Sequence, residues 1–105
     1  MNIVVTLPKG ERLVKSQYRG QPAVFWTISK KPSDLNINDR VYFVDGDAIS
    51  YYHPFIGFAQ DPMCETTGRV YAGLTLILGA DGIPLKTPFP FQGFRGFHYF
   101  HKDLS

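Results

Sequence analysis

The chain has 105 residues, of which 44% are hydrophobic and 19% charged, and its formal net charge is +2. This length suits a single domain with its own core, and the high apolar content excludes a disordered chain. No apolar run approaches the roughly 18 residues that span a bilayer, and the start of the chain lacks the basic and apolar regions of a signal peptide, so we expect a cytoplasmic protein with no membrane partner.

The first part of the chain contains two predicted strands with one predicted helix between them. Residues 2–7 are rich in β-branched side chains, which is typical of a strand. Residues 8–20 carry a weak apolar stripe at helical spacing, followed by Gly20 and Pro22, which end helices. Residues 23–29 alternate with period two and are largely apolar on both sides, which predicts a strand in the middle of the structure.

The centre of the chain predicts a compact strand and a longer, interrupted one. Residues 40–44 form the compact strand, which ends at a turn formed by Asp45, Gly46 and Asp47. Residues 48–60 are also strand-like, but Pro54 interrupts them. Because proline cannot donate to a ladder, we expect either an edge strand or two short pieces around a bulge.

The last third predicts further strands separated by turns. Residues 69–79 alternate clearly and are followed by a turn at Asp81 and Gly82. The segment after this turn contains Pro84, Pro88 and Pro90, so it cannot be a fully paired central strand. The whole pattern predicts a mostly-β or α+β domain, a small closed or partly closed barrel of about six short strands with one short helix near the N-terminus.

The aromatic stretch of residues 88–101, PFPFQGFRGFHYFH, permits two interpretations. It resembles the signature of RNA-recognition sheets, but that signature lies on an inner strand, whereas only five residues follow Phe100. As a closing strand, it would place Phe94 and Phe100 on the buried side. Arg95 and Tyr99 would then lie on the opposite side, where they are candidates for contact with a ligand.

Metal and cofactor chemistry is not indicated. The three histidines and Cys64 show no metal-ligand spacing, and no glycine-rich loop opens a helix as a phosphate loop requires. Cys64 is the only cysteine, which excludes an internal disulfide and agrees with a reducing compartment. We therefore expect no cofactor and no metal, and we assign no catalytic residue.

Residues 25–62 resemble the PUA-like superfamily, and within it the EVE and ASCH domains. The resemblance rests on a strand containing Trp26, a loop containing Lys30 and Pro32, and the turn NDRV at residues 38–41, which leads into an aromatic strand. Asn38 stands where the family usually has glycine, and asparagine tolerates a left-handed conformation. The Gly-x-Lys-x-x-Glu-x-Arg motif of ASCH domains is not present in the sequence.

The resemblance implies one PUA-like pseudo-barrel of five to six strands over residues 1–105, with a helix between the first two strands and a cleft that binds RNA or a modified base in DNA. Such a cleft needs an aromatic wall for the base and cations for phosphate. The candidates for these roles are Trp26, Lys30, Lys31, Arg40, Arg95 and Tyr99. Basic residues predominate in residues 1–31, which suits an anionic partner.

Two other functions remain open at this point. One is an ASCH-like amidohydrolase that acts on acylated cytidine, for which Thr27, Lys30 and either Glu11 or Glu65 are available. The other is a small phage or mobile-element protein that inhibits a host system through an exposed aromatic surface. The sequence does not predict an oligomeric state.

Overall fold

The computed structural model of the protein describes residues 1–9, 13, 15–63 and 68–104. These residues contain no helix, and so none that is long and apolar enough to cross a membrane. They form eight strands: β1 (Asn2–Thr6), β2 (Lys15–Tyr18), β3 (Gln21–Thr27), β4 (Arg40–Asp45), β5 (Ala48–Gln60), β6 (Leu74–Gly79), β7 (Ile83–Pro90) and β8 (Phe97–Phe100).

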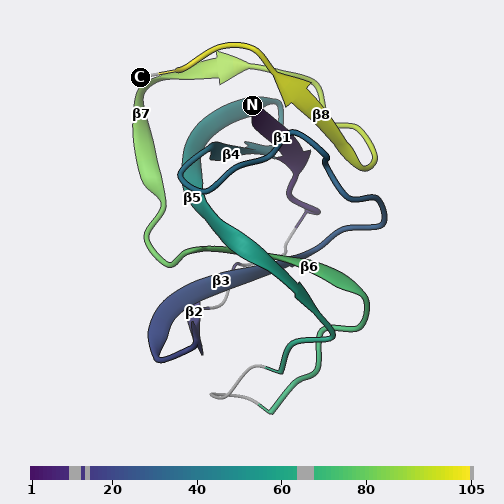
Figure 1. Ribbon diagram of the computed structural model, residues 1–105. Helices are drawn as coiled ribbons and strands as arrows, with labels where there is room; N and C mark the ends of the chain where they lie inside the picture. The colour runs from purple at the N-terminus through teal and green to yellow at the C-terminus, as the bar shows by residue number, and fades with distance from the viewer. Residues whose placement is uncertain (10–12, 14, 64–67, 105) are drawn as a thin grey trace.

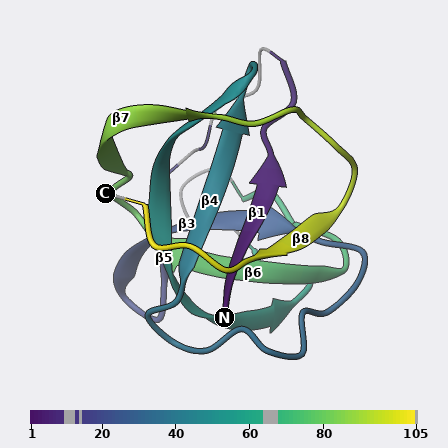
Figure 2. The same cartoon turned by 90° about the horizontal axis from the view of Figure 1, so that it is seen from above.

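The strands are hydrogen-bonded in the order β2-β3-β6-β5-β4-β1-β8, and β7 pairs with β5 beside this path. The long strand β5 belongs to both halves of the molecule, because its first part pairs with β4 and β7 and its last part with β6. It curves from one half to the other in Figure 1, and Figure 2 shows β1 and β4 running across β3 and β6. The fold is therefore two layers that share one strand.

The pairing of β5 is irregular where it changes partners. Register shifts occur on β5 between Ile49 and Tyr51 and between Phe55 and Gly57. Pro54 lies within the strand, opposite Arg40. Of the two expectations for this segment, the structure retains the bulge but keeps the strand continuous.

The main core fills the space between the two layers. Strand alternation directs Ile3, Val5, Val41 and Phe43 of one layer inward, and they meet side chains from β3 and β6 such as Leu76. A second cluster, around Tyr42 and Phe100, covers the outer face of the first layer, and a third, around Phe25 and Ile77, covers the outer face of the second.

The helix expected over residues 8–20 is wrong where the structure describes that segment, because Lys15–Tyr18 is strand β2; residues 10–12 and 14 lie outside the described residues. β2 pairs with β3 through a two-residue turn in which Arg19 and Gly20 have φ of 51° and 79°. Two positive φ values are what a tight hairpin turn requires. Pairing with β3 therefore overrides the weak helical stripe, and Gly20 serves the turn rather than a helix end.

The described residues show the expected β-rich fold, but neither the expected number of strands nor the closure of the barrel. The domain is mostly β, but it has eight strands rather than five or six, and β2 and β8 end the order without pairing to each other in the part of the chain that the structure describes. β6 begins at Leu74 rather than at Arg69. The proline-rich strand β7 pairs with β5 alone, as its prolines predict.

The closing strand follows the predicted alternation. β8 pairs with β1, with Phe97 opposite Val5 and Tyr99 opposite Ile3, so both aromatic residues share the inner face. Phe100 is buried in the second cluster, and Phe94 is half-buried against the same cluster.

Candidate nucleic-acid interface

A cavity of about 580 Å³ opens between the two layers at the end of β3, and we call it the Trp26 cavity. Its wall combines the end of β3, the end of β1, the start of β6 and the loop before β8. The lining residues are Thr6, Trp26, Thr27, Ile28, Ser29, Ala72, Gly73, Leu74, Phe94 and Gly96.

Trp26 reaches this cavity from the core side of β3. It follows Val24 on the inner face of the strand, and its ring meets that of Phe43 edge to face, with the centroids 5.1 Å apart. The indole is only half-buried, because the cavity lies beside it. Trp26 thus packs on the core with one side of its ring and faces the cavity with the rest.

A second cavity of about 410 Å³ adjoins the first, and we call it the Arg95 cavity. It is lined by Ser29, Lys30, Arg95, Gly96, Phe97, His98 and Tyr99. Ser29 and Gly96 line both cavities, so the two are direct neighbours. Lys30 and Arg95 are exposed, and no aspartate or glutamate of the described residues lines either cavity. The Arg95 cavity is therefore positively charged, and it lies beside the Trp26 cavity, which is lined by aromatic residues.

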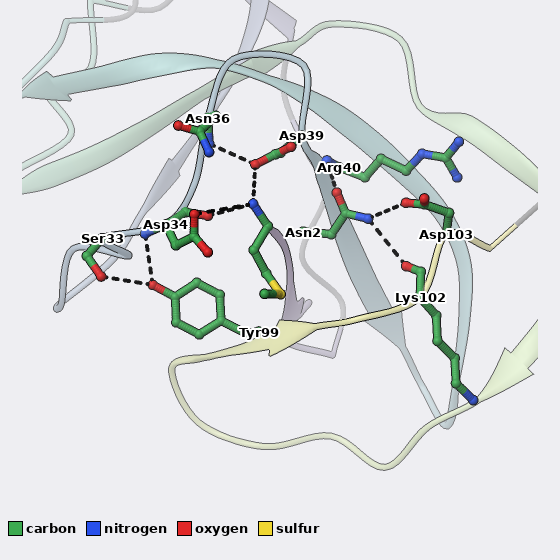
Figure 3. Close-up of polar contacts among 10 residues, drawn as sticks. Asn2, Ser33, Asp34, Asn36, Asp39, Arg40, Tyr99, Lys102 and Asp103 are labelled. Atoms are coloured by element: carbon green, nitrogen blue, oxygen red, sulfur yellow. Dashed lines mark hydrogen bonds and ion pairs between the residues drawn. The ribbon is translucent and has the colours of Figure 1, made fainter.

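Tyr99 of strand β8 forms hydrogen bonds with the loop that carries Lys30. Its hydroxyl accepts a hydrogen bond from the backbone N–H of Asp34 (3.1 Å) and lies 3.3 Å from the hydroxyl of Ser33 (Figure 3). These two contacts, with Ser33 first, lower the pKa of Tyr99. The Tyr99 ring thus lines the cavity while its hydroxyl fixes the loop.

The far end of the same loop is held by Asp39. Its carboxylate accepts hydrogen bonds from the backbone N–H of Asn36 (2.8 Å) and the amino group of Met1 (2.6 Å), as Figure 3 shows. Burial alone would raise the pKa of Asp39, but these hydrogen bonds outweigh it and lower the pKa. Asn38 beside it has φ of 74°, the left-handed conformation for which asparagine is suited.

Lys31 and Arg40 are not part of the two cavities. The ammonium of Lys31 lies over the ring of Phe58, 5.0 Å from its centroid. Arg40 alternates with Val41 and so faces the outer cluster, where its guanidinium lies over the Tyr52 ring and donates to the Tyr42 hydroxyl at 3.1 Å. The structure thus brings together four of the six predicted residues, Trp26, Lys30, Arg95 and Tyr99, and places the other two elsewhere.

Of the residues considered for amide hydrolysis, two line the neighbouring cavities. Thr27 lines the Trp26 cavity and Lys30 the Arg95 cavity, whereas Glu11 and Glu65 lie outside the described residues. Within the described ranges, no group of three or more His, Cys, Asp or Glu side chains is arranged to hold a metal ion.

Thr6 and Ser29 belong to the site but were not predicted. Ser29 adjoins Lys30 in the sequence, and this proximity was an available signal. No sequence signal pointed to Thr6, because its place in the site depends on the loop before β8, which is distant in the sequence. The Phe94 N–H of that loop donates to the Thr6 hydroxyl at 3.0 Å. Comparison with protein-family models, curated proteins and solved structures found no match to this chain.

Proposed function

We propose that this protein is a small PUA-like domain that binds nucleic acid, either RNA or DNA with a modified base, by holding a base in the Trp26 cavity and phosphate in the Arg95 cavity. The observation that carries the proposal is that two neighbouring cavities share Ser29 and Gly96, one of them walled by Trp26 and the other by Lys30 and Arg95. The left-handed Asn38 supports the PUA-like assignment, because the family usually has glycine at this turn.

The size and chemistry of the Trp26 cavity suit a nucleobase. Its 580 Å³ falls within the roughly 300–1,000 Å³ that is typical of small-molecule sites. Trp26 offers an aromatic surface for stacking, and Thr6, Thr27 and Ser29 offer hydroxyls to the polar edge of a base. A base is flat, apolar on its faces and polar at its edge, which matches this lining.

The charges of the Arg95 cavity suit phosphate. A single strand loses affinity with a log–log salt slope of about −0.7 for each phosphate that a cation neutralises. Contacts from Lys30 and Arg95 therefore predict at least about sevenfold weaker binding when salt rises from 50 to 200 mM. A salt-independent affinity would contradict the phosphate contacts.

The direct test is fluorescence anisotropy with labelled RNA and DNA oligonucleotides of mixed sequence, with and without modified bases. Lys30→Ala and Arg95→Ala are expected to weaken binding and flatten the salt slope. Lys86→Ala is the matched control, because Lys86 is an exposed lysine of β7 that lines neither cavity. Failure of every oligonucleotide to bind would reject the proposal and favour a protein partner.

One observation favours amidohydrolase activity as a second candidate: Thr27 and Lys30 line adjoining cavities. In hydrolysis of an acylated cytidine, the Thr27 hydroxyl would attack the acyl carbon as the C–N bond to cytidine breaks, and its proton would pass to the released cytidine amine. Water would then hydrolyse the Thr27 ester to the free acid, and Lys30 would lower the pKa of the Thr27 hydroxyl. Release of free acid that Thr27→Val and Lys30→Ala both abolish would support this candidate. Release that persists in both variants would reject it.

A further inference from the structure

His98 is a third side chain of the Arg95 cavity that can carry a positive charge. It lines this cavity together with Lys30 and Arg95, and its side chain is exposed. Within the described part of the chain, no hydrogen bond or ion pair engages either nitrogen of its imidazole. The imidazole is therefore free to contact a ligand in the cavity.

The His98 ring is held in place by Phe94. The two ring centroids lie 4.3 Å apart, with the planes at 66°. Phe94 lines the Trp26 cavity, and its N–H donates to the hydroxyl of Thr6 on β1. The Phe94–His98 pair thus contributes one ring to the lining of each of the two neighbouring cavities.

The charged side chains that line the two cavities with His98 are cations. On the paired side of β8, His98 lies opposite Val4 of β1, which carries no charge. Val4 and Phe94 belong to the outer cluster, on whose aromatic rings two further cations lie. The described titratable groups of this cluster and of the Arg95 cavity are Lys30, Arg95, Tyr99, Tyr42, Tyr52, Arg40 and Lys102.

The carboxylates on the neighbouring segments have partners of their own. Asp34 lies 3.8 Å from the amino group of Met1, and Asp39 accepts a hydrogen bond from the same group. Asp103 accepts a hydrogen bond from the Asn2 amide at 2.7 Å. None of these three carboxylates lines either cavity, so a positive charge on His98 needs its counter-ion from the ligand.

An imidazole carries a positive charge only when it has gained a proton, and histidine side chains change charge in the range of about pH 5 to 8. Lys30 and Arg95 disfavour a third positive charge in their cavity, whereas a phosphate placed there favours it. Proton binding and phosphate binding at this cavity therefore strengthen each other.

We propose that His98 is a phosphate-binding residue of the Arg95 cavity and that it acts in its protonated form. This inference rests on the proposed nucleic-acid binding and adds a contact that depends on pH. Two phosphate contacts predict about sevenfold weaker binding of a single strand between 50 and 200 mM salt, and three contacts predict about 18-fold. The salt effect is therefore expected to rise from about sevenfold at pH 7.5 to about 18-fold at pH 5.5.

The test is fluorescence anisotropy at pH 7.5 and 5.5 with a ten-nucleotide single strand that carries a pH-insensitive dye. The strand has no terminal phosphate, because a terminal phosphate itself titrates near pH 6. At 50 mM salt, the wild type is expected to bind about two- to fivefold more tightly at the lower pH. His98→Gln is expected to remove this gain and to keep the salt effect at about sevenfold at both pH values.

Two further variants control the comparison. His101→Gln is expected to keep the gain and the larger salt effect, because His101 is an exposed histidine that lines neither cavity. His98→Lys carries a permanent charge, so it is expected to show the larger salt effect at pH 7.5 as well. Circular dichroism at both pH values establishes that each protein is folded.

Titration calorimetry at pH 6.5, in two buffers of different ionisation enthalpy, measures the same linkage without acid conditions. The wild type and His101→Gln are expected to take up protons when they bind the strand, and His98→Gln is expected to take up fewer.

The outcomes separate this inference from the proposed function. If Lys30→Ala and Arg95→Ala weaken binding while His98→Gln keeps the proton uptake and the pH dependence of the wild type, the inference fails alone. A salt effect of the wild type that is equal at the two pH values also overturns it. If no oligonucleotide binds at either pH, the proposed function fails and the inference fails with it.

Discussion

Replacing Gly79 with alanine tests the close contact between the end of β6 and Pro54 of its neighbouring strand β5. A Cβ at Gly79 would lie 2.7 Å from Cγ and 3.1 Å from Cδ of Pro54. Carbon atoms in contact normally lie about 3.5–4.0 Å apart, and the proline ring cannot rotate away because it is closed onto the backbone. Overpacking of this kind costs about 1–3 kcal/mol, so we expect Gly79→Ala to lower the free energy of unfolding by that amount.

Gly57→Ala is the matched control. Gly57 is also a half-buried strand glycine without positive φ, but no atom lies within 4 Å of the Cβ that alanine would add. This variant is expected to keep the wild-type stability or to gain up to about 1 kcal/mol, because alanine restricts the unfolded chain. Chemical and thermal unfolding followed by circular dichroism would measure both, with a shift of about 4–8 °C for each kcal/mol. Equal stability of the two variants would refute the close approach of Gly79 to Pro54.

Two further changes probe the loop of Asn38 and the buried His53. Asn38→Ala is expected to lower stability by about 1 kcal/mol and Asn38→Gly to be neutral or stabilising, since φ is 74° at this position; equal urea midpoints for the two variants would contradict the left-handed turn. Burial lowers the pKa of His53 below its ordinary 6.5, although the hydrogen bond between its Nδ1 and the Gly79 carbonyl opposes the shift. The unfolded chain therefore binds a proton more readily than the folded one, and stability present above pH 6.5 is lost as the pH falls below 6.5 toward the folded pKa. Urea unfolding at pH 7.5 and 5.5 should show this loss in the wild type and in His98→Gln but less of it in His53→Gln, and an unchanged loss in His53→Gln would exclude His53 as its source.

The strands were predictable where a local pattern determines them. The alternation of Val24, Trp26 and Ile28 indicated a buried strand, and the structure places all three on one inner face. The β2–β3 hairpin was not predictable in the same way, because Lys15–Tyr18 has little apolar alternation and depends on β3 for its pairing. The sharing of β5 between two layers also depends on partners distant in the sequence.

In the candidate site too, residues placed by a local pattern were predictable, and residues placed by contacts distant in the sequence were not. Arg95 and Tyr99 were predicted on the side of the last strand opposite Phe100, and they line one cavity with Lys30. Arg40 was included for its place in the sequence, although its alternation with the buried Val41 would have put it on the outer face. Ala72 could not have been predicted, because it lines the cavity only through the approach of its segment to β3.

The most direct measurement uses the fluorescence of Trp26, the only tryptophan of the chain. Titration with a ten-nucleotide single strand is expected to change its emission saturably, with a midpoint that moves to higher strand concentration in Arg95→Ala and at higher salt but not in Lys86→Ala. Binding of the strand by anisotropy with no change in Trp26 emission would contradict a base held against this ring.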